Sequence, residues 1–432
     1  MLGNADARIY PNRQARRNGQ QGDGMTNGEV DIVAARESGL DPEQLDAMAA
    51  YLDGHVGPGR FAHAALLISR DGRPVMSTRS GAAREDGTLL AENALFRIAS
   101  MTKPVTALAW TMLMEQGLTD LDQRVDAVLP ELADVGVYVS GGDGDPFATR
   151  PVDTPMRMVD LLRHTSGFTY GFQNRTPVDA AYRNLDLDDF HQARDPDDYI
   201  AALAQLPLEF APGSAWNYSV SNDVLGVVVE RLSGMSLDAF FSTRIFAPLG
   251  MDDTFFRVPP DRLDRMTDAW MMDGARGPVL YDRGAQTRWR MPRRFHGGGG
   301  GLVSGMADYH RFCRMLLQRG ELDGVRLVRE ETVAMMTRNH LPGGGDLSTL
   351  SRSMFSESDY AGIGYGLGFG VTVDPAQAGE FHWGGLFSTF FSIDPVEGTI
   401  MILMTQLMPS SAVPVRRTLK SMLASALRET RR

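Results

Sequence analysis

The chain has 432 residues, of which 43% are hydrophobic and 22% charged, enough for two or three domains with a large buried core. The net charge is -11 without a local basic patch, so we expect no nucleic-acid or membrane partner. A single cysteine, Cys313, excludes an internal disulfide and a cysteine-rich metal site. Only two lysines occur, Lys103 and Lys420, so a mechanism that needs a lysine has two candidates.

Residues 1–30 are polar, and the pair Arg16-Arg17 is not followed by an apolar stretch. Neither a Sec nor a twin-arginine signal fits this pattern. The chain contains no apolar run of the roughly 18 residues that a membrane span needs. We therefore expect a disordered leader over residues 1–30 and a cytoplasmic protein.

The first ordered element should be a helix over 42–53, because Asp41 can cap it and its apolar residues recur at helical spacing. An antiparallel hairpin over 62–69 and 74–79 follows, joined by a turn at Asp71-Gly72. A long helix then begins near Ser100 and ends at Gly117.

From about 120 to 290 the pattern predicts helices separated by loops, including a helix over 224–232. After it come the glycine run 297–301 and several further elements: a helix over 306–319, strands over 366–373, 381–383, 387–393 and 399–406, and a helix over 412–428.

Strands thus lie at both ends of the chain with helices between them. This order predicts an α+β fold in which helices flank one antiparallel sheet built from both chain ends. We expect an α/β domain formed by 31–120 and 291–432, a mainly helical domain over 121–290, and an active site at their junction.

Ser100 and Lys103 form a Ser-x-x-Lys pair at a helix start, which places both side chains on one face. A serine hydroxyl is a poor nucleophile until a base takes its proton. A lysine amine can be that base if burial and the positive end of the helix dipole lower its pKa. The alternative is that Ser100 only caps the helix.

Tyr218 precedes the helix over 224–232, where the helix dipole would stabilise its phenolate and let it relay a proton. By itself it would more often be a buried aromatic residue, but together with Ser100 and Lys103 the functional interpretation is favoured. His382-Trp383-Gly384-Gly385 lies on or just after the predicted strand over 381–383, and its glycines would let the backbone approach a ligand. A main-chain N–H there could form an oxyanion hole with the N–H of Ser100. The alternative is a strand end with an ordinary bulge.

These three groups, in this order, resemble the serine β-lactamase and penicillin-recognising transpeptidase superfamily. More narrowly they resemble the family VIII carboxylesterases, which have the class C β-lactamase fold. The resemblance covers residues 40–428, and shorter signatures support it, among them 161–167 and 300–304.

The resemblance implies that Ser100 is the acylated nucleophile, Lys103 its base and Tyr218 the proton relay. It also implies that substrate contacts His382, Trp383, Gly384, Leu386 and Val220. We expect Gly385 to supply the second oxyanion N–H if His382 occupies the position of the lysine of the class C Lys-Thr-Gly motif. If Trp383 occupies it, Leu386 supplies that N–H.

Two departures separate the chain from β-lactamases: Val220 stands where class C enzymes have an asparagine, and no lysine is available for a Lys-Thr-Gly motif. We therefore expect a serine carboxylesterase for short-chain acyl esters, with weak hydrolysis of cephalosporins, without cofactor or metal. The alternatives are a β-lactamase or D-alanyl-D-alanine peptidase, and a silent binding protein of the same fold. The oligomeric state stays open.

Overall fold

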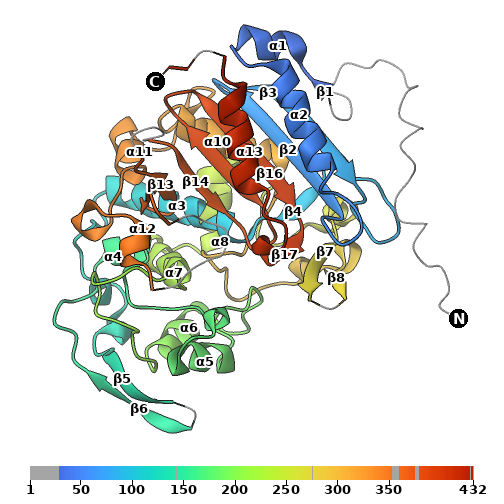
Figure 1. Cartoon of the computed structure of the whole chain (residues 1–432). Coiled ribbons are helices and arrows are strands. Elements are labelled where there is room, and N and C mark those ends of the chain that lie inside the picture. Colours follow the sequence, from blue (N-terminus) through green and yellow to red (C-terminus); the bar gives the residue numbers. More distant parts are fainter. Residues whose placement is uncertain are drawn as a thin grey trace, which may run out of the picture.

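The computed structural model describes residues 29–142, 144–274, 276–352, 360–374, 379–428 and 430–431 (Figure 1). Its largest sheet has, among these residues, eight antiparallel strands in the spatial order β1-β3-β2-β16-β15-β14-β13-β12. They are β1 (Glu29–Val30), β2 (His63–Arg70), β3 (Arg73–Gly81), β12 (Ile363–Tyr365), β13 (Gly370–Thr372), β14 (Phe381–Gly384), β15 (Phe390–Asp394) and β16 (Thr399–Thr405). The predicted α+β fold, with its antiparallel sheet built from both chain ends, is confirmed.

The centre of this sheet is buried on both faces, as β16 shows. Ile400, Ile402 and Met404 belong to the larger core cluster, whereas Met401 and Leu403 belong to a second cluster on the opposite face. Side chains alternate along a strand, so a strand that is apolar at every position must have both faces covered.

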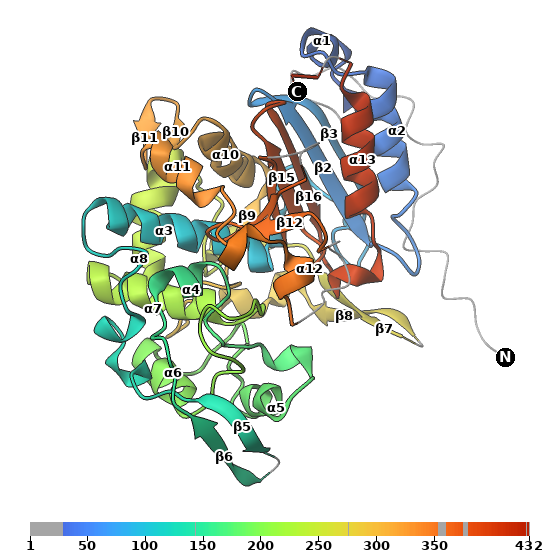
Figure 2. The same ribbon diagram turned by 60° about the vertical axis from the view of Figure 1, so that its left-hand side comes forward.

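Helices from both chain ends cover one face: α1 (Ile32–Glu37), α2 (Pro42–Asp53) and α13 (Arg416–Ala426) (Figure 2). The Asp41 side chain caps α2 as expected, accepting from the N–H of Glu43 at 3.0 Å. The Asp41 N–H donates to the carbonyl oxygen of Ala426 at 2.8 Å, so the start of α2 is joined to the end of α13.

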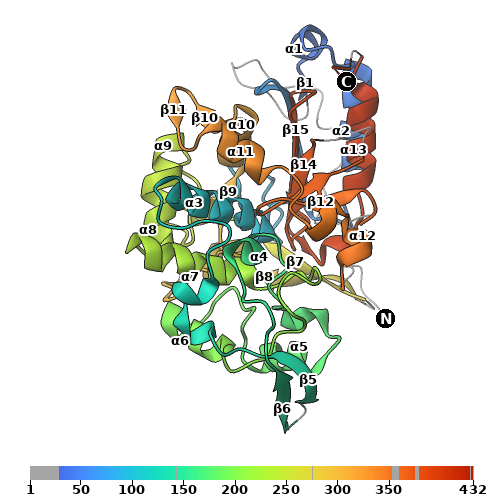
Figure 3. The same ribbon diagram turned by 90° about the vertical axis from the view of Figure 1, so that its left-hand side faces the viewer.

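The other face packs against α3 (Lys103–Glu115) and α10 (Met306–Leu317) (Figures 2 and 3). The remaining helices are α4 (Met158–Leu162), α5 (Pro177–Asn184), α6 (Pro196–Leu203), α7 (Ser221–Ser233), α8 (Leu237–Phe241), α9 (Ala247–Leu249), α11 (Glu330–Met336) and α12 (Leu347–Leu350). Helix α12 lies beside β12 at the edge of the sheet (Figure 2).

The segment 121–290 is not helical throughout, because it contains two hairpins that we did not predict. They are β5 (Val137–Gly142) with β6 (Asp145–Arg150), and β7 (Ala269–Asp273) with β8 (Gly277–Asp282). The first is largely exposed and lies far from the main sheet, so its residues lack the apolar alternation that marks a half-buried strand (Figure 3). The domain boundaries stay a prediction.

The remaining strands are short: β4 (Leu95–Arg97), β9 (Val303–Gly305), β10 (Glu321–Leu322), β11 (Val325–Arg326) and β17 (Leu407–Met408). Most of the expected leader, residues 1–28, lies outside the described residues, while residues 29 and 30 form β1 and pair with β3. No helix in the described part of the chain is both long and apolar enough to cross a membrane.

Candidate active site

Ser100 lies in a short 3₁₀-helical turn, Ala99–Thr102, between β4 and α3. Strand β4 pairs with β9, about 200 residues further along the chain, with Leu95 opposite Gly305 and Arg97 opposite Val303. Since β9 directly follows the glycine run, this long-range pairing brings residues 297–301 beside the serine. Ala99, immediately before Ser100, has a φ of 44°, a strained value for a residue with a side chain.

The Ser-x-x-Lys spacing places the two side chains together. Lys103 Nζ lies 3.1 Å from Ser100 Oγ and donates to the carbonyl oxygen of Gly299 at 2.6 Å. The lysine is fully buried. Burial lowers the pKa of Lys103 well below its ordinary value, and the negative charge of Asp223 opposes this shift. Lys103 can therefore be a neutral amine close to a serine hydroxyl.

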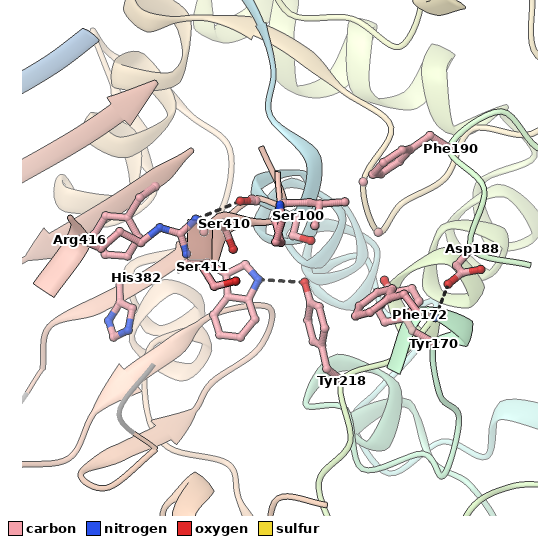
Figure 4. Close-up of a pocket in the computed structure, with 18 of the residues that line it drawn as sticks. Ser100, Tyr170, Phe172, Asp188, Phe190, Tyr218, His382, Ser410, Ser411 and Arg416 are labelled. Carbon is pink, nitrogen blue, oxygen red and sulfur yellow. Dashed lines mark hydrogen bonds between the residues drawn. The ribbon is translucent and has the colours of Figure 1, made fainter. Parts of the chain in front are cut away.

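Tyr218 points toward Ser100 across the site (Figure 4). Its hydroxyl hydrogen-bonds with Ser100 and accepts from Trp383 Nε1 at 3.2 Å. Burial raises the pKa of Tyr218 above the ordinary value, and these two hydrogen bonds only partly offset the rise. Burial of Tyr218 thus opposes the phenolate that we expected the helix dipole to stabilise, and of these two groups the lysine is the one whose pKa is lowered.

The five glycines 297–301 allow close packing around the lysine. A Cβ on Gly298 would lie 2.4 Å from the carbonyl oxygen of Asn222, and one on Gly299 would lie 2.4 Å from Asp223 Oδ2. At the other three positions a Cβ would come within 3 Å of Asp223, Phe190 or Phe256. The run is thus a tightly packed wall beside Lys103.

Gly385, the expected second oxyanion donor, has its amide occupied. Its N–H donates to the carbonyl oxygen of Thr389 at 2.8 Å. The glycine is needed for another reason, since a Cβ there would lie 2.4 Å from the carbonyl oxygen of Ile98. The next amide, that of Leu386, has no acceptor in the part of the chain that the structure describes, and Leu386 lines the site.

The side chains of β14 alternate between two surroundings. Trp383 faces Tyr218, with ring centroids 5.5 Å apart. His382 faces the side of α13 and lies near Arg416 (Figure 4), and a Cβ on Gly384 would lie 2.5 Å from Arg416 Nη1. Trp383 therefore takes the position next to the catalytic groups. This geometry favours the alternative in which Leu386 supplies the amide.

Ser100, Tyr218, His382, Trp383, Gly384, Gly385 and Leu386 line one cavity of about 1080 Å³. Val220 does not line it: the side chain is fully buried in the larger core cluster, and its N–H donates to Thr169 O at 3.2 Å. The expected substrate contact at Val220 is therefore wrong, because the residue begins α7 and its side chain points into the core.

Sequence reasoning missed several residues that line the cavity: Tyr170, Phe172, Asp188, Phe190, Asp223 and Arg416. Except for Asp223, which is five residues after Tyr218, they lie far from the motifs in the sequence. The sequence signal was an acidic residue in the first turn of a helix, Asp223 in α7. Lys420, the second of the two lysines, is half-buried at the cavity wall and pairs with Glu380 at 3.0 Å.

The ring of His164 packs against the ring of Tyr218, with centroids 4.9 Å apart. Asn222 Nδ2 lies 3.2 Å from His164 Nε2, and His164 Nδ1 lies 3.1 Å from Ser219 Oγ. Burial lowers the pKa of His164 well below its ordinary value and so favours the neutral ring.

Among the described residues, no group of three or more His, Cys, Asp or Glu side chains is arranged to hold a metal ion. The cavity instead brings together a serine, a buried lysine, a phenol and a peptide amide. A serine beside a base and an oxyanion donor is the arrangement that acyl transfer requires.

Comparisons with known proteins agree with this site. The family profile described as Beta-lactamase matches residues 48–424. Protein Rv1367c of Mycobacterium tuberculosis is 34% identical over 336 residues, which cover 76% of this chain and 81% of that protein. Esterase EstB of Burkholderia gladioli is 31% identical over 409 residues, or 88% of this chain and 94% of EstB. The solved structure of EstCE1, described as a hydrolase with promiscuous acyltransferase activity, has the same fold, with a TM-score of 0.73, 23% identity and coverage of 91% of this chain and 100% of EstCE1.

Proposed function

Because the chain belongs to the β-lactamase family and its relatives are of the family VIII esterase type, we propose that it is a serine carboxylesterase. It hydrolyses short-chain acyl esters through an acyl-enzyme on Ser100. One observation carries the proposal: Ser100 Oγ lies 3.1 Å from the amine of a fully buried lysine, at the wall of a cavity.

In acylation, the neutral amine of Lys103 takes the Ser100 proton while Oγ attacks the ester carbonyl carbon. The carbonyl oxygen becomes an oxyanion, which the N–H groups of Ser100 and Leu386 stabilise. When the tetrahedral intermediate collapses, the bond to the alcohol oxygen breaks. That oxygen takes the proton of Tyr218, and Tyr218 regains a proton from the Lys103 ammonium.

Deacylation repeats these transfers with water in place of the alcohol. Water gives one proton to the Tyr218 and Lys103 pair and attacks the acyl carbonyl carbon. The bond to Ser100 Oγ then breaks as the serine regains its proton. Trp383 holds the phenol oxygen throughout by donating from Nε1 at 3.2 Å.

We also infer weak hydrolysis of cephalosporins. The cavity of about 1080 Å³ is large enough for a bicyclic substrate, and the same nucleophile would open the ring. Two features argue against β-lactams or D-alanyl peptides as main substrates. Val220 is buried and has no side-chain amide, whereas class C β-lactamases have an asparagine at this position. Trp383 packs beside Tyr218 at the position where a lysine would bind the substrate carboxylate in those enzymes. The cytoplasmic location stays a prediction, since it rests on residues 1–28.

The test uses p-nitrophenyl butyrate, a cephalosporin and a fluorophosphonate probe that labels activated serines. We expect wild-type protein to hydrolyse the ester and take up the label, and Ser100→Ala to do neither. Full ester hydrolysis by Ser100→Ala would overturn the assignment of the nucleophile. A kcat/KM that strongly favours the cephalosporin would make β-lactam hydrolysis the main activity. Failure of the wild type to label would indicate a silent binding protein.

A further inference from the structure

Asp223 is joined to the base through a single residue, Gly299. Its Oδ1 accepts the N–H of Gly299 at 2.9 Å, and the carbonyl oxygen of Gly299 accepts from Lys103 Nζ at 2.6 Å. Asp223 is in the first turn of α7, whereas Lys103 begins α3 and Gly299 lies in the loop before β9. Three segments that are far apart in the sequence therefore meet at this glycine.

We propose that Asp223 is a positioning residue that holds Gly299 and, through it, the amine of Lys103 in line with Ser100 Oγ. The inference rests on the proposed role of Lys103 as base. Asp223 lies close against the backbone of Gly299, since a Cβ at that position would be 2.4 Å from Asp223 Oδ2, and the hydrogen bond to the Gly299 N–H fixes the residue on this side. With the Gly299 carbonyl held in place, one N–H of the amine is committed to it, and the nitrogen lone pair can face the serine.

The carboxylate also acts on Lys103 through its charge. Burial favours the neutral amine, whereas the nearby negative charge of Asp223 favours the ammonium. Asp223 thus keeps the pKa of Lys103 from falling further, so that the amine can both accept and return a proton. The other titratable groups around this pair are His164, Tyr170, Tyr218, Asp188 and Tyr199.

Two substitutions separate the effect of the hydrogen bond to Gly299 from the effect of the carboxylate charge. Asp223→Asn keeps an oxygen that can accept from Gly299 but removes the charge, whereas Asp223→Ala removes both. Glu230→Gln is the matched control, since Glu230 is on the same helix, accepts the N–H of Leu237 at 2.7 Å and does not line the cavity. Ester kcat/KM and the rate of fluorophosphonate labelling are measured from pH 5 to 9, with thermal unfolding of every variant.

For Asp223→Asn we expect the acid limb of both profiles to move to lower pH by about one unit or more, because the lost charge had favoured the ammonium. Its alkaline plateau should stay within about threefold of wild type. Asp223→Ala should lower that plateau about 10- to 100-fold, because the amine loses its orientation. Glu230→Gln should leave both features unchanged.

An acid limb that stays in place in Asp223→Asn, or an alkaline plateau in folded Asp223→Ala equal to wild type, overturns the inference while the proposed function stands. A shift of the same size in Glu230→Gln also overturns it, since the effect would then be general to buried carboxylates of α7. A wild type that neither hydrolyses esters nor labels overturns the proposed function, and the inference with it.

Discussion

Trp383 Nε1 donates a hydrogen bond to the phenol oxygen of Tyr218 at 3.2 Å, so one aromatic residue from the main sheet holds another at the start of α7 (Figure 4). The donor offsets part of the rise in the Tyr218 pKa that burial causes. This hydrogen bond connects strand β14 with the segment just before α7, where the proposed mechanism transfers a proton.

Trp383→Phe removes this donor but retains an aromatic ring against Tyr218 and Tyr365. One hydrogen bond is worth about 1 kcal/mol, so we expect ester kcat to fall about fivefold with little change in KM. Steady-state kinetics on p-nitrophenyl butyrate provide the measurement. A kcat equal to that of wild type would show that the indole N–H does not act on the phenol.

Leu386→Pro removes the amide that we assign to the oxyanion hole. Loss of one such donor costs about 100- to 1000-fold in kcat. Leu386→Ala retains the N–H and is the control for side-chain effects on the cavity. If both variants fold, as judged by circular dichroism, and lose activity equally, the amide is not the donor.

Gly298→Ala tests the close packing of the glycine run. The added Cβ would lie 2.4 Å from the carbonyl oxygen of Asn222 and 2.9 Å from the side chain of Thr106. We expect the free energy of unfolding to fall by about 1–3 kcal/mol, together with a loss of activity. Gly274→Ala is the control, because a Cβ there meets no atom within 4 Å. Equal stability of the two variants in urea would contradict the packing argument.

The pH dependence of kcat/KM should follow Lys103. The neutral amine is the active form, and burial lowers its pKa far below the value of about 10.4 for an exposed lysine. Activity should therefore increase with pH along an acid limb whose midpoint lies far below that value. Lys103→Arg, which stays protonated, and Lys103→Ala should both be inactive. Ester hydrolysis by either variant would exclude Lys103 as the base.

Stability should decrease on mild acidification because of buried histidines. Burial lowers the pKa of His63 to about 4 and that of His310 to about 4. Between about pH 6.5, where an unfolded histidine titrates, and these values, the unfolded state binds more protons. The free energy of unfolding must then fall as pH falls. Urea denaturation at pH 7.5, 6 and 5 measures this slope, and His310→Gln should make it shallower; an unchanged slope would contradict the assignment.

Local patterns in the sequence were enough to predict the elements with strong periodicity or clear caps, such as α2 after Asp41 and α7 before Gly234. They also predicted the meeting of Ser100 and Lys103, because residues three apart in a helical turn share a face. The antiparallel sheet built from both chain ends followed from the distribution of predicted strands, and the family followed from the order of the motifs. These features depend on neighbours in the chain or on spacing, which a sequence displays directly.

Only the tertiary structure decided how distant segments share the cavity. The pairing of β4 with β9 places Gly299 beside Lys103, and the α7 start adds Asp223, with no pattern that links the three in the sequence. The N–H of Gly385, which we expected to face the oxyanion, instead donates to the carbonyl oxygen of Thr389 in the turn after β14. The pKa of Tyr218 rises because packing removes water from the phenol, an effect of burial that outweighs the hydrogen bonds with Ser100 and Trp383. Contacts and burial of this kind are properties of the folded chain. A motif can therefore identify candidate reacting residues, but their pKa values and hydrogen-bond partners depend on the fold.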